Sequence, residues 1–116
     1  EKKILPIWIG PPEALSIAQA LTGAAPPRPM THDLFCDALK GLGAAVYRVY
    51  VDRLEQGTYY AKCGIMAGEV KTDLDSRPSD AIALALRFNA PIFISESLLQ
   101  CMMDDDEEAP GPKARE

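Results

Sequence analysis

The sequence predicts a single α+β domain in which three to four helices pack against a mostly antiparallel, mixed sheet. Three observations support this fold class. The chain has 116 residues, of which 47% are hydrophobic, and this suffices for one domain with its own core. Runs rich in β-branched and aromatic residues are bounded by glycines. Other segments carry apolar residues at helical spacing and begin with proline or threonine.

The helical segments share recognisable ends. Proline suits the first helical turn, threonine suits an N-cap, and an acidic residue suits the positive end of the helix dipole. Glycine or an Asn-Ala-Pro sequence ends each segment. Small residues in the first and third helices lead us to expect both against the sheet. The expected helices run from Pro11 to Gly23, from Thr31 as N-cap to Gly43 and from Pro78 to Asn89, with a short one after Ser95 reaching about Met103.

The strand segments are short and separated by turn residues. Gly57 and Gly68 mark two turns, so the central strands should form an antiparallel meander. Pro6 within the first apolar run suggests an edge strand or a bulge. The expected strands cover residues 3–9, 45–51, 58–67, 70–74 and 92–94.

The domain is expected to cover residues 1–103, and residues 104–116 are expected to form a disordered acidic tail. The chain begins at Glu1 and leads almost directly into an apolar run. We therefore expect that N-terminal strands of the natural protein are missing from this sequence.

The net charge of −5 is concentrated in the tail, which holds six of the 17 acidic residues but two of the 12 basic ones. The rest of the chain is close to neutral and has no cluster of lysines and arginines. Much of a protein's affinity for nucleic acid comes from its basic residues. Binding of nucleic acid to this chain by charge alone is therefore disfavoured. An enzyme acting on nucleic acid would need a divalent metal or a surface shared within an oligomer.

The three cysteines, Cys36, Cys63 and Cys101, are far apart and include no Cys-x-x-Cys pair. This pattern favours buried, reduced thiols over a disulfide framework or a zinc site, and it predicts a cytoplasmic protein. The sequence has no signal peptide and no apolar run long enough to cross a membrane, so no membrane partner is expected.

The start of the second expected helix is the first candidate site. His32 and Asp33 lie where free backbone N–H groups can hold an anion, and His32 can transfer protons near neutral pH. His32 is the only histidine, which excludes a two-histidine mechanism within one chain. The alternative is structural: Thr31 caps the helix, Asp33 complements its dipole and His32 packs in a turn.

The start of the third expected helix is the second candidate site. Asp75 precedes it, and Arg77, Ser79 and Asp80 lie at its beginning. Carboxylates beside a helix N-terminus can hold Mg²⁺ or Mn²⁺ next to a phosphate, so Asp75 and Asp80 are candidate metal ligands. The alternative is that Asp80 caps the helix and Arg77 pairs with a neighbouring acid.

If the three helix starts meet at one edge of the sheet, they form one polar cluster. Its members would be Glu13, His32, Asp33, Arg77 and Asp80. The four tyrosines can stack nucleobases, but their strand positions favour packing in the core or at an interface. The tyrosines are Tyr47, Tyr50, Tyr59 and Tyr60.

Three segments, in this order, resemble the bifunctional nuclease domain family of bacteria and plants. They are Leu5-Pro6-Ile7-Trp8-Ile9-Gly10, Arg28-Pro29-Met30-Thr31-His32-Asp33-Leu34 and Ser76-Arg77-Pro78-Ser79-Asp80-Ala81-Ile82-Ala83-Leu84-Ala85. The resemblance runs from about residue 3 to residue 100.

The resemblance implies a nuclease that hydrolyses phosphodiester bonds in DNA and RNA. His32, Asp33, Arg77, Ser79 and Asp80 lie within the matched segments. We predict catalytic roles in this set and substrate binding by Arg28 and Ser79. The catalytic candidates are His32, Asp33, Arg77 and Asp80. The alternative is a non-catalytic interaction or regulatory module that forms a homo-oligomer, with a dimer favoured. In that case the same polar residues would serve as caps and salt bridges.

Overall fold

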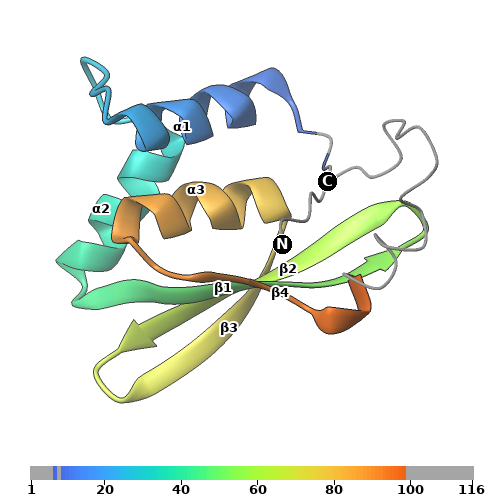
Figure 1. Cartoon of the computed structure of the whole chain (residues 1–116). Coiled ribbons are helices and arrows are strands. Elements are labelled where there is room, and N and C mark those ends of the chain that lie inside the picture. Colours follow the sequence, from blue (N-terminus) through green and yellow to red (C-terminus); the bar gives the residue numbers. More distant parts are fainter. Residues whose placement is uncertain (1–6, 8, 99–116) are drawn as a thin grey trace.

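The computed structural model describes residue 7 and residues 9–98. In this part of the chain, three longer helices lie on one side of a four-stranded sheet (Figure 1). The predicted α+β class and mixed sheet are therefore confirmed. Most of the strand expected at residues 3–9, the end of the last short helix and the acidic tail 104–116 lie outside the described residues.

The helices are α1 (Pro11–Thr22), α2 (Thr31–Gly41) and α3 (Pro78–Phe88). Their starts at proline in α1 and α3 were predicted, but the N-cap of α2 is Met30 and not Thr31. The reason is the Asp33 carboxylate, which accepts the backbone N–H of Met30 at 3.0 Å and so fixes the helix start there. Ser95 precedes a short helical segment, as predicted, and its hydroxyl accepts the N–H of Leu98 at 3.4 Å.

The strands are β1 (Ala44–Glu55), β2 (Thr58–Ala67), β3 (Val70–Ser76) and β4 (Ile92–Ile94). Their order in the sheet is β3-β2-β1-β4. The first three form the predicted antiparallel meander, and β4 pairs with β1 in parallel.

Strand β1 is longer than the predicted 45–51 because it contains two irregularities in its pairing with β2. One lies between Val46 and Arg48 and the other between Val51 and Arg53. Each inserts a residue without ending the ladder. Opposite the first, the Tyr47 ring lies over Gly64, where an added Cβ would approach the Tyr47 Cε1 atom to 2.9 Å.

Helix α3 lies directly on the sheet because its contact face is made of small residues. Ala81 and Ala85 are fully buried in the core, together with Val49 of β1 and Ala61 of β2. Helix α1 packs chiefly on α3, so the expectation that α1 and α3 both lie on the sheet was wrong for α1 (Figure 1). An alanine-rich face permits close packing on a helix as readily as on a sheet, and the sequence could not distinguish the two.

None of the helices in the described part of the chain has the length and apolar character needed to cross a membrane.

Candidate active site

Polar side chains from all three helices form one connected set of contacts between the helices. We call this set the inter-helix network. It contains all five residues of the cluster predicted from the helix starts, and it adds residues from the middle of α1 and the end of α3. Its members are Glu13, Ser16, His32, Asp33, Arg77, Asp80 and Arg87.

Asp80 is the branch point of the network. Its Oδ1 lies 2.8 Å from Nε2 of His32, and its Oδ2 accepts a hydrogen bond of 2.8 Å from Nε of Arg77. Arg77, the N-cap residue of α3, also donates through Nη2 to Glu13 Oε2 at 3.1 Å. The predicted Arg77–Asp80 pair is therefore present. Asp80 contacts these two side chains, and α3 has no side-chain hydrogen bond at its N-cap.

The hydrogen bonds around His32 indicate its tautomer. His32 Nδ1 lies 2.6 Å from Ser16 Oγ, which also accepts a 3.1 Å hydrogen bond from Nη2 of Arg87. Because arginine can only donate, the Ser16 hydroxyl proton is available to Nδ1. Neutral His32 then carries its proton on Nε2 and donates it to Asp80.

The order serine, histidine, aspartate resembles the triad of nucleophilic hydrolases. Ser16 has a different role here, because its side chain is only 4% exposed, accepts from Arg87 and does not line the cavity described below. The hydroxyl of Ser16 therefore orients the imidazole and is not presented to a substrate.

Arg87 joins all three helices at the side of the network away from Arg77. Its Nε donates to Asp33 Oδ1 at 2.8 Å, and its Nη2 donates to the backbone carbonyl of Ser16 at 3.2 Å. Its Nη1 donates to the carbonyl of Ala83 within α3 at 2.9 Å. Through these contacts Arg87 fixes the middle of α1 and the start of α2 relative to α3.

The two aspartates of the network have lowered pKa values. Hydrogen bonds from Arg87 and from the Met30 backbone lower the pKa of Asp33. For Asp80, burial opposes ionisation, but hydrogen bonds from Arg77 and His32 outweigh it and lower the pKa. Both carboxylates are therefore ionised at neutral pH, as their contacts with arginine require.

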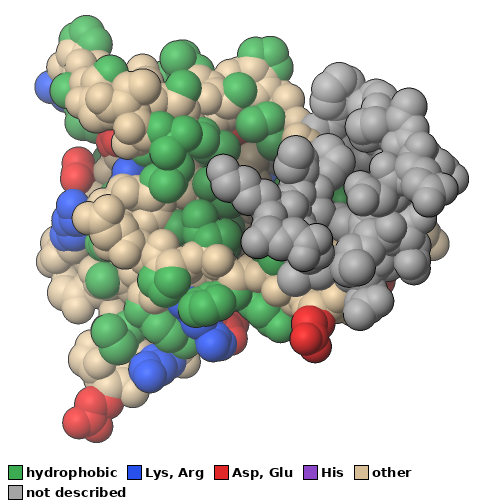
Figure 2. Space-filling model, viewed as in Figure 1, with side chains coloured by type: hydrophobic (Ala, Val, Ile, Leu, Met, Phe, Trp, Pro, Cys, Tyr) green, Lys and Arg blue, Asp and Glu red, His purple; other side chains and the backbone are tan. Residues whose placement is uncertain are grey.

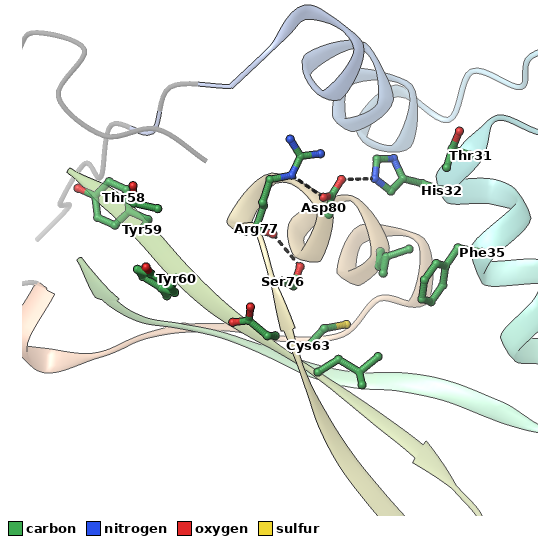
Figure 3. Close-up of a pocket in the computed structure, with 13 residues that line it drawn as sticks. Thr31, His32, Phe35, Thr58, Tyr59, Tyr60, Cys63, Ser76, Arg77 and Asp80 are labelled. Carbon is green, nitrogen blue, oxygen red and sulfur yellow. Dashed lines mark hydrogen bonds and ion pairs between the residues drawn. The ribbon is translucent and has the colours of Figure 1, made fainter. Parts of the chain in front are cut away.

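A cavity of about 630 Å³ opens beside Asp80, between the starts of α2 and α3 and the strands β2 and β3 (Figure 3). His32, Arg77 and Asp80 lie at its polar end, and Phe35 projects from α2 at another part of the wall (Figure 3). The full lining is Thr31, His32, Phe35, Thr58, Tyr59, Tyr60, Cys63, Leu74, Asp75, Ser76, Arg77, Asp80 and Leu84.

Asp75 also lines the cavity, but its carboxylate faces Lys62 at 3.8 Å and is largely exposed. Alternation along β3 places Asp75 on the same side of the strand as Asp73, which pairs with Arg48. Among the described residues, no three His, Cys, Asp or Glu side chains are grouped as a metal site. Any metal here would need ligands from the substrate or water as well.

The remaining predicted site residues lie away from the cavity lining. Asp33 is turned toward Arg87 and lines a separate hollow beside α1. Ser79 is only 1% exposed, so its side chain is enclosed by the protein. Arg28 lies exposed in the segment between α1 and α2. The structure thus brings His32, Arg77, Asp80 and Asp75 to one cavity.

Sequence reasoning missed Ser16 and Arg87. Their contacts join residues 16 to 71 positions apart in the chain, and no local motif reports such a distance. The one available signal was a serine among the apolar residues of α1, since a buried hydroxyl must find a partner.

Charged side chains are mixed on the surface. On the face that Figure 2 shows, lysines and arginines occur in small groups beside acids and hydrophobic residues. On the strands, three of the cations lie over tyrosine rings: Arg48 and Lys71 over Tyr47, and Arg53 over Tyr60. The near-neutral charge expected from the sequence thus comes from cations and acids that lie close together. The described residues on the face in Figure 2 form no broad basic area.

Comparison with known proteins identifies the family of the chain. The bifunctional nuclease domain matches residues 1–105 of the chain. The chain therefore belongs to the bifunctional nuclease domain family, as the three sequence segments indicated.

Relatives are found in bacteria and plants. An uncharacterised protein of Mycobacterium tuberculosis strain H37Rv is 43% identical over 97 residues, covering 84% of this chain and 57% of that protein. Bifunctional nuclease 1 of Oryza sativa subsp. japonica is 28% identical over 98 residues, covering 82% of this chain and 30% of that protein. The chain thus spans about half of the first relative and less than a third of the second.

Proposed function

We propose that the protein is a nuclease that hydrolyses phosphodiester bonds of DNA and RNA at the cavity beside Asp80. The observation that carries this proposal is the Asp80 carboxylate, held between His32 and Arg77 at the wall of a cavity of about 630 Å³. Family membership supports the same activity, because relatives in rice are named bifunctional nucleases.

The three side chains suit the reaction in different ways. Arg77, which is partly exposed, would offset the charge of a bound phosphodiester. Water would attack phosphorus while Asp80 accepts its proton, the bond to the leaving oxygen breaks, and that oxygen takes a proton from solvent. His32 holds the carboxylate through Nε2 and is the neighbouring group for further proton transfer. Asp33 acts indirectly by fixing Arg87, and Arg28 and Ser79 lie outside the reacting set.

Charge balance supports a requirement for Mg²⁺ or Mn²⁺. When His32 is uncharged, the charged residues of the lining are two carboxylates, Asp75 and Asp80, and one cation, Arg77, so a phosphodiester would approach an excess of negative charge. Mg²⁺ is commonly held by one or two carboxylates together with phosphate oxygens. Asp80 and Asp75 are the carboxylates of the cavity lining that would hold it. A bound ion would offset the charge of the phosphate.

The test is cleavage of single-stranded DNA and RNA oligonucleotides by the purified chain, with Mg²⁺ or Mn²⁺ titrated from zero in the presence of chelator. We expect Asp80→Asn and His32→Gln to lower kcat/KM by roughly 10²- to 10⁴-fold, because each removes a proton-transfer group. We expect chelation of the metal to abolish turnover.

Asp73→Asn is the matched control, because Asp73 forms an exposed ion pair with Arg48 at 3.4 Å and does not line the cavity. It should leave kcat/KM unchanged. Thermal unfolding of each variant separates loss of activity from loss of fold. Cleavage that persists in the folded Asp80→Asn variant would place the activity elsewhere and refute this site.

A second candidate function is that of a non-catalytic, homo-oligomeric module. The observation in its favour is on the sheet face away from the helices, where Tyr50 and Phe93 are neighbours on paired strands and both are exposed. Exposed aromatic residues of this kind are enriched at protein interfaces. A dimer through this face would leave the inter-helix network with a purely structural role.

Light scattering at micromolar concentrations tests this candidate. A dimer through the sheet would have twice the 12.6 kDa mass of the chain, and Tyr50→Glu would return it to a monomer. A monomer in the unsubstituted protein would remove the candidate. Assignment to the cytoplasm also remains a proposal, and it rests on the two buried free thiols of Cys36 and Cys63.

A further inference from the structure

The cavity has a polar end and an apolar end. Three elements each contribute lining residues of both kinds. On α2, His32 and Phe35 are three residues apart and lie on one face of the helix. On α3, Asp80 and Leu84 are four residues apart and also share a face. On β3, Leu74 and Ser76 are two residues apart and point to the same side of the strand. Each of these elements thus supplies both polar and apolar residues to the lining.

The apolar end is open to solvent. Phe35 is 41% exposed and Leu74 is 42% exposed, although both line the cavity. Cys63, the partner of Leu74 on β2, also lines the cavity, and burial raises the pKa of its thiol to about 11, so it remains uncharged. Apolar surface left in water is unfavourable, so a ligand that covers it binds more tightly. The exposed ring of Phe35 is also a surface on which another flat ring can stack.

We propose that the cavity binds one unpaired nucleotide, with its phosphate at the end formed by Arg77 and Asp80 and its base against Phe35. The identity of the phosphate as a phosphodiester rests on the proposed function. A nucleotide fits because it joins a charged group and a flat, weakly polar ring through a sugar. On α2, His32 at the polar end and Phe35 at the apolar end are about one helical turn apart, roughly 5 Å between Cβ atoms, which is within the span of a nucleotide.

The proposal defines a substrate class. A base inside a duplex is stacked and paired, so it cannot enter a side cavity unless it is flipped out. Stacking on an aromatic ring tolerates any base, because every base presents a flat face. The cavity should therefore favour single-stranded DNA or RNA over duplex without strong sequence preference, and this would explain how one site serves both nucleic acids.

The test uses a minimal ligand that contains no bond for the enzyme to cut. Binding of thymidine 3′,5′-bisphosphate and of its abasic counterpart is measured by NMR titration with Mg²⁺ present. The base-bearing ligand should bind roughly 5- to 150-fold more tightly, as expected for stacking of one base on an aromatic side chain. Phe35→Leu should remove this preference while keeping an apolar residue, and Phe35→Tyr should retain it.

Leu34→Ala is the matched control, because Leu34 is an exposed apolar residue of the same helix that does not line the cavity. It should leave both affinities unchanged. Because Phe35 is partly exposed, its substitution should leave the fold intact, and the NMR spectrum of each variant reports this directly. In a double-mutant cycle, the losses of binding free energy caused by removing the base and by removing the Phe35 ring should not be additive, because both changes remove the same contact.

Equal or undetectable binding of the two bisphosphates would overturn the proposal, as would a base preference that survives Phe35→Leu. Cleavage of a single-stranded oligonucleotide is measured in parallel to separate this proposal from the proposed function. Cleavage without a base preference refutes base binding and leaves the nuclease assignment standing. A base preference that Phe35→Leu abolishes, without cleavage, supports base binding and refutes the nuclease assignment.

Discussion

At the scale of single residues, the position of Asp80 shows how one carboxylate can join two helices and still line a cavity. Its sequence position, three residues into α3, is typical of a residue that caps its own helix. In the structure its two oxygens instead contact His32 and Arg77, each at 2.8 Å. These contacts keep the carboxylate ionised and fixed at the cavity wall, a combination that preorganised active sites require.

Arg87 is the residue whose loss should cost most stability within the network. Arg87→Ala would leave the Asp33 carboxylate and the carbonyl of Ser16 without these donors in a partly buried position. We expect the free energy of unfolding to fall by roughly 1–3 kcal/mol. Urea denaturation monitored by circular dichroism measures this change.

Arg48→Ala is the control for this substitution, because Arg48 forms an ion pair with Asp73 at 3.4 Å in which both side chains are exposed. Its cost should be below about 1 kcal/mol. If the two substitutions cost the same, Arg87 does not hold the helices together as the contacts suggest.

At the scale of elements, the sequence predicted the helices and strands well where local chemistry decides them. Proline predicted the starts of α1 and α3, and glycine predicted the turns between the strands. The sequence was less informative where contacts between distant residues determine the structure. The Asp33 carboxylate moved the N-cap of α2 to Met30, and two irregularities extended β1 to Glu55. Ser16 and Arg87 could not be found because their partners come from other helices.

Strand β2 offers a test of the irregular pairing with β1. A Cβ added at Gly64 would lie 2.9 Å from Cε1 of the Tyr47 ring and 3.1 Å from Cγ of Arg48. Gly64→Ala should therefore push the ring off the strand and lower the free energy of unfolding by roughly 1–3 kcal/mol. Chemical denaturation measures the loss.

Gly41 provides the comparison, because an added Cβ meets nothing within 4 Å and the residue ends α2. Gly41→Ala should be neutral or stabilise by up to about 1 kcal/mol, since alanine favours a helix and restricts the unfolded chain. Equal effects at Gly41 and Gly64 would show that the Tyr47 ring does not restrain this position.

At the scale of the whole molecule, the helices are joined by ionised groups, and stability should depend on pH accordingly. The pKa of Asp33 is lower in the folded chain than the ordinary value of 3.8, chiefly because of its hydrogen bond from Arg87. A lowered folded pKa gives stability that is present above the unfolded pKa and is lost as the pH falls through the folded pKa.

We therefore expect the free energy of unfolding to decrease as the pH falls below about 4, near the unfolded pKa of aspartate. Asp33→Asn should be less stable than the parent at neutral pH and should lose less stability on acidification. Urea midpoints measured from pH 7 downward give both curves. Parallel curves for parent and variant would mean that Asp33 does not contribute to the acid sensitivity.

The position of α1 has a further consequence. The segment between α1 and α2, residues 24–30, is mostly exposed, and α1 is held to the rest of the domain by α3 and by the contacts of Glu13 and Ser16. A cut in this segment would make α1 a separate peptide that supplies the hydroxyl which orients His32. The domain is thus a natural candidate for fragment complementation, in which the state of the histidine is controlled by a helix added in trans.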